Sequence, residues 1–229
     1  MNKTISSVIF GLALISLVAP RQADALPTLE LSDGSTTVTV GDGSGSDSLA
    51  APGGVTFIGA VGGWTVNVTT GLTKPTLGSA TAPHLNLTSF NLRSSGTSTL
   101  TIKFSEVGFI LAPTNWEAAI SGTQAAAGTQ YQSYLDNGNT LFGTTTLLTD
   151  SLCICGSPFA NTQISGVAGG GTFSLTQKIT LSASASGFTF KSFNANLQPV
   201  PEPASLLLLG SGLIGLSGFG FWRRKNNQA

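Results

Sequence analysis

Apolar and polar residues alternate with a period of two along much of the chain between residues 26 and 200. The alternation is clear in the segments 64–69, 100–105 and 173–185, where small polar residues separate the apolar ones. Such alternation is typical of β-strands that bury one face and expose the other. In the first segment the residues predicted to be buried are Trp64, Val66 and Val68, and those predicted to lie outside are Thr65, Asn67 and Thr69.

The phase of the alternation changes near the end of this region. Phe188 and Phe190 have one parity, whereas Phe193 and the apolar residues after it have the other. A change of parity within a strand needs one extra residue, because each side chain points to the face opposite that of its neighbour. We therefore expect a bulge or a corner near Lys191 and Ser192.

Turn signals rich in glycine, asparagine and proline separate the alternating segments. They are Asp33-Gly34, Asp42-Gly43, Pro52-Gly53-Gly54, Gly62-Gly63, Lys74-Pro75, Ser95-Gly96, Asn137-Gly138 and Gly169-Gly170-Gly171. Many short strands with frequent turns are typical of an all-β sandwich or jelly roll. Segments 115–122 and 130–135 allow short helical pieces, but strands are the preferred prediction there. No internal repeat divides the region, so one domain is predicted.

The C-terminal end of the chain has a different pattern. Residues 204–222 form a run of 19 residues without a charge, and Arg223, Arg224 and Lys225 follow it at once. A helix of that length spans about 28 Å, close to the thickness of about 30 Å of the hydrocarbon core of a bilayer. Basic residues beside a membrane helix remain in the cytoplasm. The pattern therefore predicts a transmembrane helix over 204–222 with a cytoplasmic C-terminal end.

The N-terminal end carries a second targeting signal. Lys3 precedes the apolar run 8–19, and Ala23-Asp24-Ala25 matches the small-residue pattern of a signal-peptide cleavage site. We expect cleavage after Ala25; a short uncleaved anchor is the alternative. The chain is then divided into a signal peptide (1–25), an exported β-sandwich domain (26–198) and a C-terminal sorting segment (199–229).

The C-terminal segment also resembles a known family of signals. Pro201-Glu202-Pro203, the apolar span 204–222 and the basic end Arg223-Arg224-Lys225 stand in the order found in PEP-CTERM protein-sorting signals of Gram-negative bacteria. The resemblance implies a partner, a membrane enzyme of the exosortase type that cuts near the Pro-Glu-Pro. It also implies a setting at the cell surface or in the extracellular matrix, together with exopolysaccharide and biofilm.

The exported part carries little charge. Between residues 26 and 200 there are eight acidic and five basic side chains, a net charge of −3, and no basic cluster that would indicate nucleic-acid binding. The single histidine, His84, follows a proline and is predicted to be a surface residue rather than a catalytic base. The acidic residues are scattered, so neither a catalytic acid pair nor a zinc site is predicted. We therefore expect no catalytic activity, no metal and no cofactor.

Two short motifs in the exported part leave alternatives open. The oxygen-rich segment Asp42–Asp47 has a faint likeness to a calcium loop, but it lacks the EF-hand spacing, and a flexible hairpin or loop is the preferred interpretation. Cys153 and Cys155 are separated by one residue, and export would place them in an oxidising compartment. They are interpreted as a local disulfide in a non-strand loop, as free or intermolecularly paired thiols, or as a redox pair.

Three aromatic residues, Trp116, Tyr131 and Tyr134, are candidates for stacking against sugar rings. The alternative is that these rings fill the core. The leading hypothesis, which rests on the resemblance of the C-terminal segment, is a non-catalytic protein of the cell surface or extracellular matrix that is tied to exopolysaccharide. A carbohydrate- or ligand-binding module is the second hypothesis, and a secreted hydrolase is the third.

Overall fold

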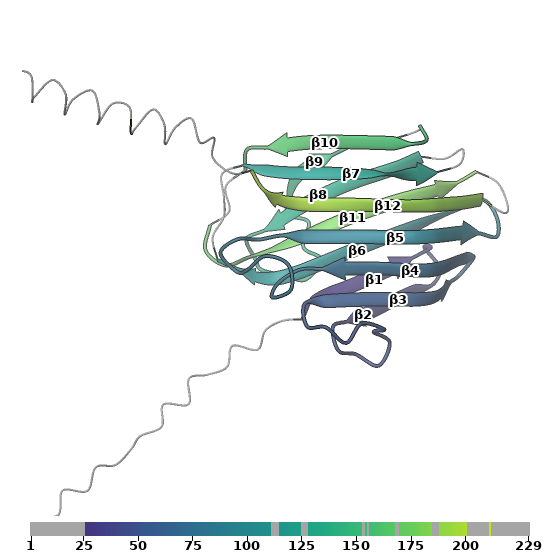
Figure 1. Cartoon of the computed structure of the whole chain (residues 1–229), viewed down its shortest axis with the longest axis horizontal. Coiled ribbons are helices and arrows are strands. Elements are labelled where there is room, and N and C mark those ends of the chain that lie inside the picture. Colours follow the sequence, from purple (N-terminus) through teal and green to yellow (C-terminus); the bar gives the residue numbers. More distant parts are fainter. Residues whose placement is uncertain are drawn as a thin grey trace, which may run out of the picture.

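The protein is a two-layer β-sandwich in a computed structural model. The structure describes residues 26–110, 115–124, 128–152, 154, 156–167, 170–184, 188–200 and 211. Within these residues, twelve strands form two six-stranded antiparallel sheets, one in front of the other in Figure 1. This confirms the predicted all-β class with two antiparallel sheets.

The chain crosses between the two sheets several times. Sheet 1 has the order β2 (Thr37–Gly41), β1 (Thr28–Ser32), β6 (Ser98–Phe109), β11 (Phe173–Ala183), β8 (Gly128–Asp136) and β9 (Thr146–Asp150). Sheet 2 has the order β10 (Phe159–Ser165), β7 (Trp116–Gln124), β12 (Phe188–Pro199), β5 (Leu85–Ser94), β4 (Trp64–Leu72) and β3 (Gly54–Val61). Residues 116–122 and 130–135 are therefore part of strands β7 and β8, as preferred from the sequence.

The core lies between the sheets and consists of the apolar side chains that alternate strand positions point inward. Its largest fully buried members are Trp64, Trp116, Tyr131, Phe104, Phe109 and Phe173. Burying a large apolar side chain of this kind contributes about 1.5–3 kcal/mol relative to leaving it in water. The alternating pattern read from the sequence therefore gives the sandwich its main source of stability.

Strand β4 follows the predicted alternation only in its first half. Trp64 and Val66 are buried, as predicted, but Val68 is only half-buried, and Thr69 is fully buried instead of exposed. The Thr69 hydroxyl satisfies its hydrogen-bonding capacity inside the core through the hydroxyl of Ser89 at 2.7 Å. The prediction was therefore wrong at Val68 and Thr69, because the parity of the buried residues changes within the strand.

The change of parity extends across sheet 2. The register between β3 and β4 shifts between Phe57 and Gly59, and Asn91 of β5 has a φ of 56°. At the same level the register between β12 and β7 shifts between Phe190 and Ser192, which confirms the predicted bulge near Lys191 and Ser192. Neighbouring strands share the irregularity, because each must keep its apolar side chains on the face that its partner buries.

Candidate ligand-binding face

The outer face of sheet 1 carries the only predicted stacking residue that reaches the surface of the described structure. Along β8 the side chains of residues 131, 133 and 135 are buried, whereas Gln130, Gln132 and Tyr134 are half-buried on the opposite face. Across the sheet, Lys178 of β11 pairs with Gln132, and Gln132 pairs with Asp150 of β9. We call this set the Tyr134 face; its members are Gln130, Gln132, Tyr134, Asp150 and Lys178.

Asp150 is the charged centre of the Tyr134 face. The amide of Gln130 donates to both carboxylate oxygens at 2.9 and 3.1 Å, and the amide of Gln132 donates to one of them at 2.8 Å. Burial opposes ionisation of Asp150, but these hydrogen bonds, a bond from the Leu152 backbone and the charge of Lys178 outweigh it and lower the pKa of the carboxyl. Asp150 is therefore an ionised carboxylate whose position is fixed by the hydrogen bonds that it accepts.

Tyr134 keeps its phenolic proton. Partial burial raises the pKa of its hydroxyl, and the negative charge of Asp150 raises it further. The phenol therefore remains neutral and is both a donor and an acceptor. With the amides, the carboxylate and the ammonium of Lys178, it forms a surface of complementary polar groups around an aromatic ring.

A loop after β8 places a second aromatic ring on the same face. Asp136 holds this loop by accepting hydrogen bonds from the Thr140 backbone at 3.1 Å and the Thr145 hydroxyl at 2.8 Å. The backbone N–H of Phe142 donates to the Ser105 hydroxyl of β6 at 3.0 Å, and the Phe142 ring lies 5.8 Å from the ammonium of Lys103. Phe142 therefore covers β6 beside the Tyr134 face.

The two rings are separated by one strand. Ser105 pairs with Thr176 of β11, and Thr176 pairs with Tyr134. Because neighbouring strands are about 4.8 Å apart, the backbone of Ser105 lies about 10 Å from that of Tyr134. The sequence pointed to Tyr134 but gave no signal for Phe142, because the loop conformation that brings it over the sheet depends on contacts between distant segments.

The other two candidate stacking residues belong to the core. Trp116 is fully buried, and its indole N–H donates to the Val167 carbonyl at 3.0 Å. Tyr131 is also buried, and its hydroxyl donates to the Asn196 carbonyl at 3.0 Å. Burial raises the pKa of Tyr131, so its hydroxyl stays protonated. These two rings therefore fill the core, which was the alternative interpretation, because their side chains point between the sheets.

His84 belongs to a polar network on the outer face of sheet 2. Its Nε2 lies 3.3 Å from the side-chain oxygen of Asn196 on β12. The amide of Asn86 on β5 donates to the same oxygen at 2.8 Å and to the side-chain oxygen of Asn194 at 3.0 Å. The histidine is half-buried and lies next to amides. The sequence did not predict this network, which joins two strands more than 100 residues apart.

The segment Asp42–Asp47 is a turn whose carboxylates bind the backbone. Asp47 accepts hydrogen bonds from the N–H groups of Gly43 at 3.0 Å and Thr56 at 2.8 Å, and Asp42 accepts one from Gly53 at 2.7 Å. In the part of the chain that the structure describes, no three His, Cys, Asp or Glu side chains converge in a way that would hold a metal ion.

Several predicted residues lie outside the described part of the chain. They are the cleavage-site residues Ala23 and Ala25, the cysteines Cys153 and Cys155, and the sorting residues Pro201, Glu202, Pro203, Arg223, Arg224 and Lys225. The predicted transmembrane helix 204–222 also lies outside it, apart from Ser211. Within the described residues, the structure contains no helix with the length and apolarity that a membrane crossing requires.

Comparison with known families identifies the C-terminal segment. Residues 199–225 match the family model of the PEP-CTERM protein-sorting motif, which confirms the resemblance seen in the sequence. This motif indicates an exported protein that is anchored at the membrane and processed by an exosortase. No curated protein matches the chain.

Solved structures with a similar arrangement of strands include a bacterial adhesin domain and carbohydrate-binding modules. The K1 cleaved adhesin domain of Lys-gingipain from Porphyromonas gingivalis W83 is 11% identical, with 63% of this chain and 96% of that chain covered and a TM-score of 0.32. TmCBM61 in complex with β-1,4-galactotriose is 6% identical, with 57% and 86% covered and a TM-score of 0.29. A carbohydrate-binding module of the β-sandwich superfamily is 14% identical, with 75% and 71% covered and a TM-score of 0.34.

Proposed function

We propose that this chain, an exported protein with a PEP-CTERM sorting signal, is a non-catalytic component of the cell surface or extracellular matrix of a Gram-negative bacterium. The single observation that carries the proposal is the sorting motif at residues 199–225. An exosortase-type enzyme processes the chain near Pro201-Glu202-Pro203, and the apolar span 204–222 tethers it to the membrane before that step. The exported domain then associates with exopolysaccharide in a biofilm.

The Tyr134 face is the surface that we assign to this association. Sugar rings present apolar C–H faces that pack on an aromatic ring, and their hydroxyl groups need both donors and acceptors. Tyr134 supplies the ring, the side-chain oxygens of Gln130 and Gln132 accept hydrogen bonds, and Lys178 donates them. Hydrogen bonds to the Asp150 carboxylate already orient both glutamine amides, so little conformational freedom is lost when a sugar binds.

Replacement of Tyr134 by alanine is expected to weaken polysaccharide binding about tenfold, because an aromatic contact of this kind contributes on the order of 1 kcal/mol or more. The measurement is binding of the purified exported protein to a glycan array and to the exopolysaccharide of the producing strain. Tyr134→Phe keeps the ring and is expected to retain most of the binding.

A matched control for this prediction lies on the opposite face. Phe90 of β5 is 54% exposed on the outer face of sheet 2, so Phe90→Ala removes an exposed ring that is not part of the Tyr134 face. Binding that is lost in Phe90→Ala and retained in Tyr134→Ala would place the polysaccharide on sheet 2 and contradict the assignment. Equal binding by both variants and the unchanged protein would show that neither ring contributes.

Neutral replacement of Arg223, Arg224 and Lys225 together is expected to impair retention or processing of the tail. The positive end keeps the apolar span oriented across the membrane, and its removal lets the span slip or invert. Cell fractionation and the intact mass of the mature protein measure the outcome. Normal mass and normal fractionation of the triple variant would contradict this expectation, and the double variant Arg223→Lys, Arg224→Lys is the control that keeps the charge.

Two other functions are distinguished by simple observations. A carbohydrate- or ligand-binding module, the second candidate, would bind a defined soluble glycan through the Tyr134 face without any dependence on the sorting signal. A secreted hydrolase, the third, would turn over glycans, esters or peptides above a heat-killed control. Turnover that disappears in His84→Ala, with the fold preserved by circular dichroism, would favour the hydrolase over the non-catalytic function.

A further inference from the structure

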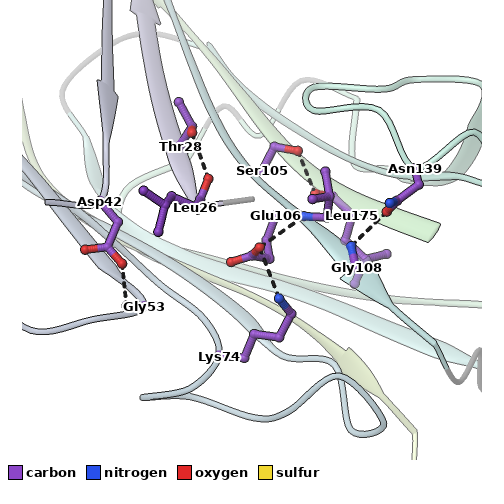
Figure 2. Close-up of polar contacts among 11 residues, drawn as sticks. Leu26, Thr28, Asp42, Gly53, Lys74, Ser105, Glu106, Gly108, Asn139 and Leu175 are labelled. Carbon is purple, nitrogen blue, oxygen red and sulfur yellow. Dashed lines mark hydrogen bonds and ion pairs between the residues drawn. The ribbon is translucent and has the colours of Figure 1, made fainter. Parts of the chain in front are cut away.

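A cavity of about 520 Å³ opens at one end of the sandwich, where the first strand begins. It lies between the start of β1, the loops before β3 and after β4, and the outer part of β6. Figure 2 shows its charged side chains: Asp42 on one side, Glu106 on the other, and Lys74 below. Leu26 lies between Asp42 and Glu106 in the same view and also lines the cavity.

Among the described residues that line the cavity, negative charges outnumber positive ones. Glu106 is only 1% exposed, and the ammonium of Lys74 lies 3.1 Å from its Oε1. The Val107 backbone N–H also donates to Oε1 at 3.2 Å. Asp42 adds a second carboxylate, whose Oδ2 accepts a hydrogen bond from the Gly53 N–H at 2.7 Å. Among the described lining residues, two carboxylates therefore face one ammonium, and the cavity has one negative charge in excess.

The start of the exported domain is held at this cavity by hydrogen bonds. The Thr28 hydroxyl donates to the Leu26 carbonyl at 3.0 Å, and the Asp42 backbone N–H donates to the Pro27 carbonyl at 3.0 Å. These bonds fix residues 26 and 27 beside the Asp42 carboxylate. Leu26 is also 53% exposed, so this residue lines the cavity at the surface rather than in the core.

We infer that the cavity is a site for a primary ammonium group, and that signal-peptide cleavage after Ala25 supplies this group as the new N-terminus on Leu26. The inference rests on the predicted cleavage site and not on polysaccharide binding. In the precursor, the nitrogen of Leu26 is a neutral amide. After cleavage it carries a positive charge, which offsets the excess negative charge of Asp42 and Glu106. Cleavage therefore adds a positive charge that balances the carboxylates of the cavity in the folded domain.

The interaction has a definite pH dependence. An α-amino group has an ordinary pKa of about 7.7–8.0. The carboxylates of Asp42 and Glu106 favour its charged form and raise its pKa in the folded state, whereas Lys74 opposes them from across the cavity. A group whose pKa is raised by folding stabilises the fold below its unfolded pKa, and the stabilisation is lost as the pH rises through the folded pKa. The stabilisation is therefore present at pH 6.5 and absent near pH 10.

The test compares two exported full-length chains that differ only at the mature N-terminus. One has the natural sequence, and the other has Gly-Ser inserted between Ala25 and Leu26, which moves the ammonium group two residues away from the cavity. Both are purified in mild detergent, and intact mass identifies each N-terminus. At pH 6.5 the natural chain is expected to unfold about 2–4 °C higher, the usual consequence of one modest interaction in a domain of this size. The difference is expected to vanish at pH 10.

Asp42→Asn, made in both chains, tests the assignment of the charge. Asparagine keeps an oxygen that accepts the Gly53 hydrogen bond but removes the negative charge, so the 2–4 °C difference at pH 6.5 is expected to fall by more than half. The inference is overturned by an N-terminus other than Leu26 in the natural chain, or by equal unfolding temperatures at pH 6.5. A difference that persists at pH 10 or in Asp42→Asn would also overturn it, since it would then arise from chain length.

Discussion

Trp64→Ala is expected to lower the free energy of unfolding by about 3–5 kcal/mol, the usual cost of removing a large buried aromatic side chain. Trp64 is fully buried at the start of β4, where it pairs with Val61 of β3 and Ser94 of β5. Its removal leaves a void between the sheets that the surrounding strands fill only in part. Urea or guanidinium unfolding, followed by circular dichroism and fluorescence, measures the loss.

The neighbouring residue provides the control for Trp64. Thr65 is exposed on the outer face of the same strand, so Thr65→Ala is expected to change the stability by no more than about 0.5 kcal/mol. A loss below about 1 kcal/mol for Trp64→Ala would mean that this end of β4 does not hold the sheets together. The assignment of Trp64 to the core would then be wrong.

The second large effect is expected at the buried ion pair between Lys74 and Glu106. Lys74→Ala leaves the Glu106 carboxylate inside the sandwich without its lysine partner and also removes the contact of the ammonium with the Phe109 ring at 5.3 Å. Removing one member of a buried pair costs about 3–5 kcal/mol, because the remaining charge is poorly solvated.

A surface ion pair in the same sheet gives the comparison for Lys74. Lys103 and Glu30 lie 2.8 Å apart, but their side chains are 28% and 22% exposed, so Lys103→Ala is expected to cost no more than about 1 kcal/mol. Equal losses in Lys74→Ala and Lys103→Ala would contradict the view that burial makes the first pair important. Thermal and denaturant unfolding at pH 7 measures both losses.

Local patterns were sufficient to predict the class of the fold. Alternation in segments such as 173–185 identifies strands because the side-chain period of a strand is two, whatever its partners are. The same reasoning failed at Val68 and Thr69. The change of parity there is shared with β3 and β5, and pairing between distant segments determines it. The bulge in β12 was predictable because both phases of its alternation are visible in one continuous segment.

The candidate site was predicted only in part, for a similar reason. Trp116, Tyr131 and Tyr134 are equally aromatic in the sequence, and only the face of the strand to which each points separates the surface ring from the buried ones. The pairing of Lys74 with Glu106 was not predicted, because it joins a loop and a strand that are 32 residues apart. Glu106 does stand in the otherwise apolar and weakly polar segment Phe104–Phe109, and an isolated acid in such a segment is a usable signal of a buried partner.

The position of β12 determines how the domain responds to mechanical tension. The strand ends at Pro199, where the sorting segment begins, and it lies between β5 and β7 inside sheet 2 (Figure 1). Its ladders with these neighbours extend over Phe188–Leu197 and Phe190–Pro199. When the tail is held and the domain is dragged along the strand axis, both ladders are sheared together instead of opening one bond at a time, as they would at a sheet edge. Forced unfolding is limited by the rate of crossing that barrier, so a pull on the sorting segment must shear both ladders before β12 can leave the sheet.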